Sequence, residues 1–209
     1  HGGQSIPAFD YYMAPGVLKT FKKEFKQAIY NYLEFEGFKE LINFNKVTDI
    51  IDKLDTIEID LGIFEEFTSK STRLKEIFES AYENAMKRTD RATYQAMEAF
   101  IHNLNTMHSR AGAQVPFSSI NFGTDTSPEG RMVIKNYLLA TEAGLGHGET
   151  PIFPISIFKV KEGVNYNKED KNYDLFRLSC RVSAKRLFPN FSFIDAPYNK
   201  KYYVPGDYN

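Results

Sequence analysis

The 209-residue sequence predicts an α/β fold, with a helical first part and a second part in which strands and helices alternate. Two observations predict it. Before residue 105, apolar residues recur every three or four positions over two long stretches, which is typical of amphipathic helices. After residue 114, apolar runs of strand length alternate with helical patterns, and this order is typical of parallel strands joined by crossover helices.

The first helix is predicted over residues 12–35, with Gly37 as its stop. Its apolar positions are Val17, Leu18, Phe21, Phe25, Ile29 and Leu33, with Lys and Glu between them. Residues 38–67 have no clear period, and we expect one or two short helices with loops there.

A second long helix is predicted over residues 71–104, because no Gly or Pro interrupts the pattern before Asn105. At 1.5 Å per residue it would be roughly 50 Å long. Its apolar stripe consists of Leu74, Ile77, Phe78, Ala81, Ala85, Ala92, Ala96, Ala99 and Phe100. Two interpretations remain open: the stripe packs against the first helix, or the helix pair meets its own copy across a two-fold axis.

In the second part, "VPFSSINF", "IFPISIFKV" and "NFSFIDAPYN" are predicted strands. Between the first two, Ser127 as a hydroxyl cap and Pro128 after it predict a helix start. Between the last two, "NYDLFRLSCRVSAKRLF" predicts an amphipathic helix capped by Asn172.

The formal net charge of −1 argues against a chain that holds nucleic acid by bulk charge. No apolar run approaches the roughly 20 residues of a membrane span, and no signal peptide opens the sequence. One cysteine, Cys180, leaves no internal disulfide and no multi-cysteine metal site. A reduced, cytoplasmic setting fits best, without a membrane partner.

The cysteine and the histidines are interpreted as structural residues rather than as reactive or metal-binding ones. Cys180 lies in a helical pattern and is expected to be a small core residue. The histidines, His1, His102, His108 and His147, lack the spacing of a metal pair, so no metal site is expected. His147 lies in "GLGHGETPIFP", which is expected to be a tight connection that needs positive φ.

Two polar segments are candidates for ligand binding. "GTDTSPEGR" lies where a strand ends and a helix begins, so it could bind an anion, but capping of the helix by its own side chains is favoured. "HSRAGAQ", residues 108–114, combines small residues with the guanidinium of Arg110 and the amide of Gln114, groups that suit a nucleobase edge or a phosphate. On chemistry alone a solvated turn is favoured over a nucleotide-binding loop.

Several long, colinear segments resemble the anaerobic, class III ribonucleoside-triphosphate reductases, a glycyl-radical enzyme family. They are "HGGQSIPAFDYYMAPGV", "QAMEAFIHNLNTMHSRAGAQVPFSSINFGTDTSPEGR", "GLGHGETPIFPISIFKVKEGVN", "NYDLF" and "SAKRLFPNFSFIDAPYN". The resemblance implies a ten-stranded α/β barrel made of two antiparallel halves of five parallel strands, of which this chain would be about one half. Residues 1–107 would form the helical dimerisation and effector-binding region, and residues 108–209 the parallel β/α part of the barrel, as one structural unit of a longer chain.

The resemblance implies that the 108–114 loop joins an effector nucleotide at the dimer interface to the substrate pocket. The effector-binding residues carried over are His108, Ser109, Arg110, Ala111, Gly112 and Gln114, with Gln4 in a second loop. Lys87, Arg88 and Arg91 are candidate phosphate partners, although three such cations also suit a solvated face. Ser118, Ser119 and Asn121 are expected to approach the substrate.

The family reduces ribonucleoside triphosphates through a cysteine thiyl radical, generated by a glycyl radical that a radical-SAM iron–sulfur activase installs, with formate as reductant. The resemblance places those cysteines, the radical Gly and a C-terminal zinc site outside this segment, so no catalytic residue and no bound cofactor is assigned to it. Its expected ligands are effector nucleoside triphosphates (dNTP or ATP), and its expected partners are a second copy, the rest of the chain and the activase. The alternative is a stand-alone α/β domain that binds a nucleotide or a sugar phosphate.

Overall fold

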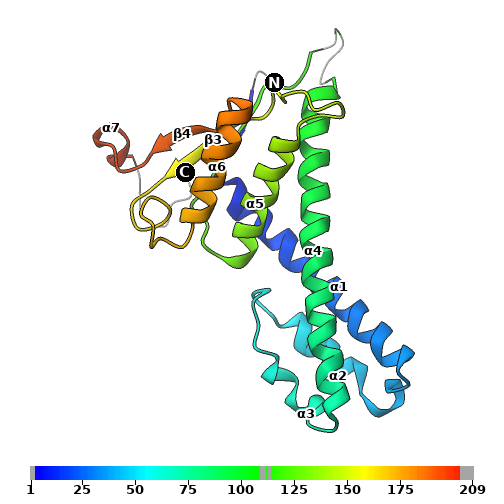
Figure 1. Cartoon of the computed structure of the whole chain (residues 1–209). Coiled ribbons are helices and arrows are strands. Elements are labelled where there is room, and N and C mark those ends of the chain that lie inside the picture. Colours follow the sequence, from blue (N-terminus) through cyan, green and yellow to red (C-terminus); the bar gives the residue numbers. More distant parts are fainter. Residues whose placement is uncertain (1–2, 109–111, 113, 203–209) are drawn as a thin grey trace. The chain divides into compact units, whose positions relative to one another are not determined.

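The computed structural model describes residues 3–108, 112 and 114–202, and they form an α/β fold. The elements, most of which are labelled in Figure 1, are β1 (Gln4–Ile6), α1 (Phe9–Phe35), α2 (Phe44–Asp52), α3 (Glu65–Thr68), α4 (Thr72–Thr106), β2 (Ser118–Phe122), α5 (Pro128–Ala143), β3 (Ile155–Val160), α6 (Tyr173–Arg186), β4 (Asn190–Phe193) and α7 (Pro197–Lys200). Two short 3-10 helices, Lys39–Leu41 and Leu61–Phe64, accompany α2 and α3. The predicted strands and helices of the second part are confirmed, and so are the short helices between α1 and α4.

Contacts divide the chain into two compact units. The first joins His1–Ala14 to Thr93–Asn209, and the second consists of Pro15–Ala92. Helices α1 and α4 each contribute residues to both units. The first unit is therefore discontinuous in the sequence, with the second unit inserted into it.

Aromatic side chains form the core of the second unit. Phe21 and Phe25 of α1 both contact the ring of Tyr82 on α4, with centroids 5.8 and 5.9 Å apart. Phe25 also contacts Phe64, which in turn contacts Phe78 at 5.0 Å. Offset and edge-to-face ring pairs of this kind stabilise a core beyond the area that they bury. Of the two interpretations left open, packing of the two long helices against each other is thus observed within this unit, and the contact with a second copy stays a prediction.

The sheet of the first unit has four parallel strands in the order β1-β2-β3-β4. The sequence prediction lacked β1, which is only three residues long and pairs Gln4 with Ser118. Helix α5 connects β2 to β3 and α6 connects β3 to β4, so the predicted crossover helices are confirmed. The ten-stranded barrel stays a prediction.

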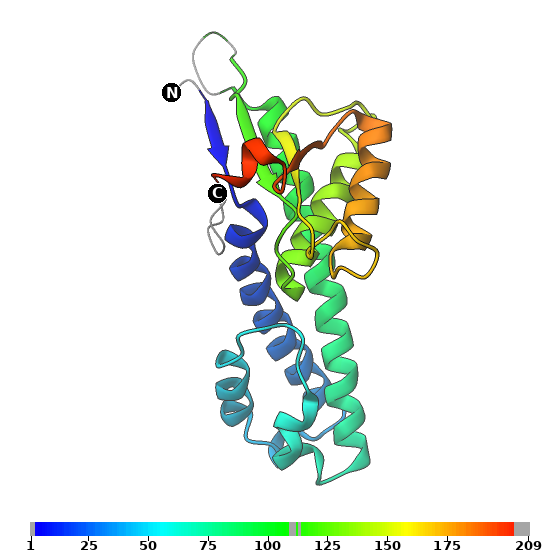
Figure 2. The ribbon, with the colours of Figure 1, turned by 90° about the vertical axis from the view of Figure 1, so that its left-hand side faces the viewer.

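Helices α5 and α6 cover one face of this sheet (Figure 2). Tyr137 of α5 contacts Phe122 of β2 at 5.1 Å, and Phe176 of α6 contacts Phe158 of β3 at 6.1 Å. The Tyr137 hydroxyl is hydrogen-bonded to Ser156, also on β3. Since neighbouring residues of a strand point to opposite faces, the residues between these contacts face away from the helices.

The buried side of α4 differs from the predicted stripe. Leu74, Ile77, Phe78, Ala81 and Ala85 are buried as expected, but Ala96 and Ala99 are exposed and Ala92 is half-buried. Beyond Ala85 the buried row continues at every fourth position, through Thr89, Thr93, Met97 and Ile101. Threonine is accepted in this row because the Thr89 hydroxyl donates to the Ala85 carbonyl.

The two predicted helix caps of the second part have different outcomes. Ser127 caps α5, because its hydroxyl accepts the Gly130 N–H at 3.0 Å, and Pro128 follows it as predicted. Asn172 precedes α6 but does not cap it. Its side-chain amide instead donates to the carbonyls of Gly123 and Asp125, and its oxygen accepts from Arg131.

Candidate functional site

The 108–114 loop connects the end of α4, at Thr106, to β2. Both described ends of the loop, His108 and Gln114, are exposed. Gly112 has φ +103°, a backbone conformation that glycine adopts without steric cost. Ser109, Arg110 and Ala111 lie outside the described residues, so no geometry is assigned to them.

Gln4 and the end of this loop lie at the same edge of the sheet. Gln4 is the register partner of Ser118, and its backbone N–H donates to the Phe117 carbonyl at 3.0 Å. Since β1 and β2 are parallel, both strands begin at this edge. The segments expected to form the two effector loops, the start of the chain and the 108–114 loop, therefore enter the sheet side by side.

An aromatic pair, exposed at Phe117 and half-buried at Phe153, lies at the same edge, and the sequence analysis did not predict it. The rings of Phe117 and Phe153 contact each other edge to face at 5.4 Å, and Phe117 is 56 % exposed. The available signal was a phenylalanine beside a proline at the start of each strand: Phe117 follows Pro116 before β2, and Phe153 precedes Pro154 before β3.

The three predicted substrate residues lie on two faces of β2. Ser118 shares the helix-covered face with Ile120 and Phe122. Its hydroxyl oxygen is buried and has no hydrogen-bond partner within the described part of the chain. Ser119 and Asn121 are half-buried on the opposite face, where they pair in register with Ile155 and Ile157 of β3.

The "GTDTSPEGR" segment holds itself in place, as the capping interpretation predicted. Asp125 accepts the Ser127 N–H, and Ser127 in turn caps α5. The buried carboxylate of Asp10 accepts the N–H groups of Gly123 and Asp125. Burial raises the pKa of Asp10, and these backbone hydrogen bonds oppose that shift. These donors serve the fold, so an anion site is not indicated here.

The three candidate phosphate partners are exposed on α4. Lys87, Arg88 and Arg91 belong to the second unit, whereas the 108–114 loop belongs to the first. Arg88 also lies 3.6 Å from the Glu24 carboxylate, an exposed ion pair that contributes little to stability.

Cys180 is exposed on α6, so the prediction of a buried core residue is wrong. The buried residues of α6 are Leu175, Ser179, Val182 and Arg186, and Cys180 lies a further 100° around the helix from Ser179. Partial desolvation raises the pKa of its thiol, which disfavours the reactive thiolate.

The turn at residues 144–149 is a tight connection, as predicted. Gly144 and Gly148 have φ values of +81° and +83°. The described residues include no group of three or more His, Cys, Asp or Glu side chains that could hold a metal ion. Across the described ranges, no helix has the length and apolar character needed to cross a membrane.

Comparison with known proteins gives a consistent result. A family model described as anaerobic ribonucleoside-triphosphate reductase matches residues 1–207. A protein of that name from Enterobacteria phage T4 is 41 % identical over 117 residues, which cover 56 % of this chain and 19 % of the relative. The Escherichia coli (strain K12) protein of the same name is 36 % identical over 107 residues, 51 % of this chain and 15 % of the relative. The match with each of these two relatives thus spans less than a fifth of the relative's length.

Proposed function

Because the chain belongs to the anaerobic ribonucleoside-triphosphate reductase family, we propose that it is the effector-sensing and dimer-forming part of such a reductase. The reductase would convert ribonucleoside triphosphates to deoxyribonucleoside triphosphates by radical chemistry, with formate as reductant. The observation that carries the proposal is the family match over residues 1–207, which favours a reductase segment over a stand-alone sugar-phosphate-binding domain.

In this proposal the effector nucleotide contacts the 108–114 loop and the start of β1. Gln4 and Gln114 are exposed at one edge of the sheet, and each amide offers both a donor and an acceptor for a base edge. Arg110 adds a planar guanidinium. Lys87, Arg88 and Arg91 are proposed partners of the effector phosphates.

Strand β2 offers a short route from the effector to the substrate. The loop ends at Gln114 and β2 begins at Ser118, so a change of the loop backbone acts directly on the strand. Ser119 and Asn121, on the face away from α5 and α6, are the residues proposed to approach the substrate. Ser118 is also proposed to approach the substrate, although it lies on the helix-covered face, where its hydroxyl is buried without a partner in the described structure.

The proposal assigns no catalytic residue to this chain. The thiyl and glycyl radicals, the zinc site and the contact with the activase are proposed to belong to other parts of the reductase. Cys180 does not suit the role of a radical carrier, because it is exposed on α6 rather than at the proposed substrate face. No residue described here is assigned to zinc.

The test is the Arg110→Ala substitution in a full-length reductase. We expect the variant to change which effector promotes the reduction of which substrate, while the rate without effector changes little. Coupling between allosteric sites is typically 1–3 kcal/mol, so the expected change in effector response is roughly 5- to 150-fold.

The matched control is Arg177→Ala, which removes an exposed arginine from α6. It should leave the effector response as in the unchanged enzyme. Wild-type effector preferences in the Arg110→Ala enzyme would refute the assignment of the 108–114 loop.

A further inference from the structure

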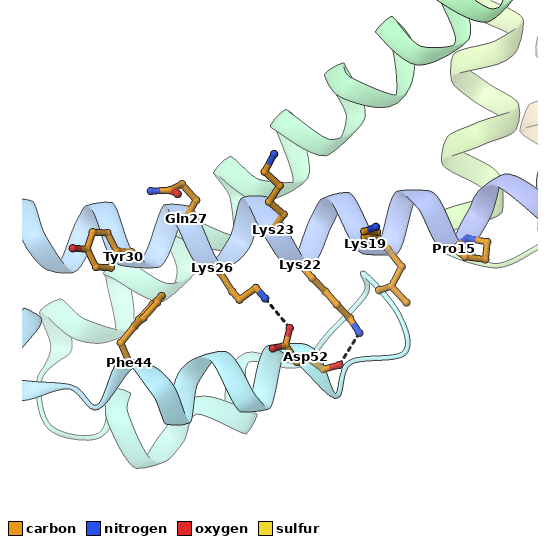
Figure 3. A pocket seen from close by; sticks show the side chains of 10 residues that line it. Pro15, Lys19, Lys22, Lys23, Lys26, Gln27, Tyr30, Phe44 and Asp52 are labelled. Atoms are coloured by element: carbon orange, nitrogen blue, oxygen red, sulfur yellow. Dashed lines mark hydrogen bonds and ion pairs between the residues drawn. The ribbon is translucent and has the colours of Figure 1, made fainter.

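A basic groove lies in the second unit, and none of the described residues assigned above lines it. It has a volume of about 800 Å³ and runs along α1 where α2 faces it (Figure 3). Four of its residues are lysines of α1: Lys19, Lys22, Lys23 and Lys26. Their spacing of three and four places them along one side of the helix, over about 10 Å of its length.

These four ammonium groups are only partly neutralised. Asp52, at the end of α2, is the one acidic residue among the described residues that line the groove. Lys26 forms an ion pair with its carboxylate at 2.7 Å, and Lys22 donates to its backbone carbonyl at 2.8 Å. Figure 3 shows both side chains directed towards Asp52, whereas Lys23 points away from it.

Lys19 and Lys23 form no hydrogen bond or ion pair with any other residue that the structure describes. Each stands three or four positions from another lysine, and like charges at these spacings destabilise a helix. An anion in the groove would remove that repulsion. The row of lysines is long enough to contact a chain of linked phosphates along its length. A single carboxylate could not contact the whole row.

One end of the groove is aromatic. Tyr30 and Phe44 contact each other edge to face at 5.4 Å, and both line the groove. Lys39 fixes the Tyr30 side chain, because its ammonium group donates to the Tyr30 hydroxyl at 2.6 Å and lies 4.6 Å from the ring centroid. A planar ring bound beside the lysine row would therefore meet a held aromatic surface.

We propose that this groove binds a nucleoside triphosphate, separately from the 108–114 loop. Lys19 and Lys23 bind the phosphates, and Lys22 and Lys26 add positive potential while they stay anchored to Asp52. Tyr30 and Phe44 contact the base. The triphosphate matches the lysine end of the groove and the base matches its aromatic end, so a ligand with both parts fits the groove better than either part alone.

The test measures the acetylation rate of each lysine in the 209-residue chain, with and without ATP, inorganic tripolyphosphate or adenosine at low salt. ATP should protect Lys19 and Lys23 and should leave the exposed Lys168 and Lys171 unprotected. Protection should weaken as salt rises, because the lysines are partly exposed and their charges are screened. The same protection should remain in the Arg110→Ala chain, so loss of the loop site and loss of this site are distinguishable.

Calorimetric titration of ATP into the Lys19→Gln/Lys23→Gln variant should show binding at the groove weakened by about tenfold or more, since hydrogen bonds to charged groups are the strong ones. The matched control, Lys168→Gln/Lys171→Gln, should bind as the unchanged chain does. Lys19→Arg/Lys23→Arg should keep the binding and so separates lost charge from a folding defect. Repeating each titration in the Arg110→Ala background shows whether the groove keeps its affinity when the 108–114 loop is changed.

Three results would overturn the proposal. Unprotected Lys19 and Lys23 at saturating ATP would mean that the groove holds no triphosphate. Equal affinity for tripolyphosphate and ATP would mean that the base makes no contact that contributes to binding, and would indicate a polyphosphate site. A short single-stranded DNA that protects these lysines at concentrations far below ATP would indicate a nucleic-acid surface instead.

Discussion

Arg186 shows how much a single side chain can organise in the first unit. Its guanidinium is 9 % exposed and donates to the carbonyls of Glu142 and Ala143, at the end of α5, and to the carbonyl of Gly148 in the following turn. The last carbonyls of a helix have no partner within the helix, and here an arginine from α6 supplies donors for them. Gly144 leaves room for it, since a Cβ there would lie 2.8 Å from Nη2 of Arg186.

We predict that Arg186→Lys lowers the free energy of unfolding by about 2–4 kcal/mol, because the shorter reach and single nitrogen of an ammonium cannot replace the donors of the guanidinium to the carbonyls of Glu142, Ala143 and Gly148. Urea unfolding followed by circular dichroism would measure the change. Arg177→Lys, at an exposed position of the same helix, is the control and should unfold as the unchanged chain does. Equal midpoints for both variants would contradict the role given to Arg186.

Tyr137 predicts a dependence of stability on alkaline pH. Complete burial raises the pKa of this phenol to about 12, from about 10 in the unfolded chain. The folded state therefore binds the phenol proton more tightly than the unfolded chain does. The resulting contribution to the free energy of unfolding is fully present below pH 10 and is lost as the pH rises towards 12. The loss should reach about 3 kcal/mol, since one pKa unit corresponds to about 1.4 kcal/mol.

Urea midpoints measured from pH 9 to 12 would test this contribution. Tyr137→Phe should flatten the decline in that window, although it also loses the hydrogen bond to Ser156. Tyr12→Phe, at a 59 % exposed position, serves as the control for the substitution. An equally steep decline in Tyr137→Phe would refute the assignment to this phenol.

At the scale of elements, α4 contains two kinds of alanine. Ala81 and Ala85 are buried within the second unit, whereas Ala96 and Ala99 are exposed in the single chain. Internal packing accounts for the first pair. The exposed pair offers a small-residue surface on which a second copy could lie closely, and this is the surface to which we assign the proposed dimer contact.

We predict that Ala96→Glu gives monomers, because a charged side chain would have to be buried at the dimer contact without a partner. Light scattering of the 209-residue chain would measure the molar mass. Ala184→Glu introduces the same change at an exposed position of α6 and should leave the mass unchanged. A dimer that survives Ala96→Glu would show that the contact lies elsewhere.

The elements with strong local signals were predictable from the sequence. Residues 17–33 and 71–104 carry helical periods, and Ser127-Pro128 marks a helix start by side-chain chemistry alone. Strand β1 was not predictable, because three residues carry no period and their pairing with β2 depends on residues more than a hundred positions away. The predictions for Asn172 and Cys180 were wrong for a related reason. Tertiary packing positions the neighbours that decide the environments of these side chains, namely Gly123 and the buried row of α6.

The candidate site was predictable only because its unusual sequence segments resemble those of a known family. Residues 108–114 have no period and no motif of general use, so residue chemistry alone left them between a ligand loop and a solvated turn. The lysine groove was not predictable, because its aromatic end comes partly from α2. A helical period indicates the apolar and polar faces of one helix but not which faces of two helices meet.

At the scale of the whole molecule, the proposal separates regulation from chemistry. We predict that the pure 209-residue chain, supplied with activase, S-adenosylmethionine and formate, forms no deoxynucleotide, while it still binds effector nucleotides. Chromatography of the reaction products would measure turnover, and a full-length reductase under the same conditions is the positive control. Detectable product from the chain alone would mean that it contains a radical site that the proposal places elsewhere.

The insertion of the second unit into the first has a consequence for how the protein is made. β2 pairs with β3 across 36 positions, Ser119 with Ile155, but β1 pairs with β2 across 114, Gln4 with Ser118. β1 must therefore wait for β2 until the whole inserted unit has been synthesised. That unit can fold during the wait, before β1 has a neighbouring strand to pair with.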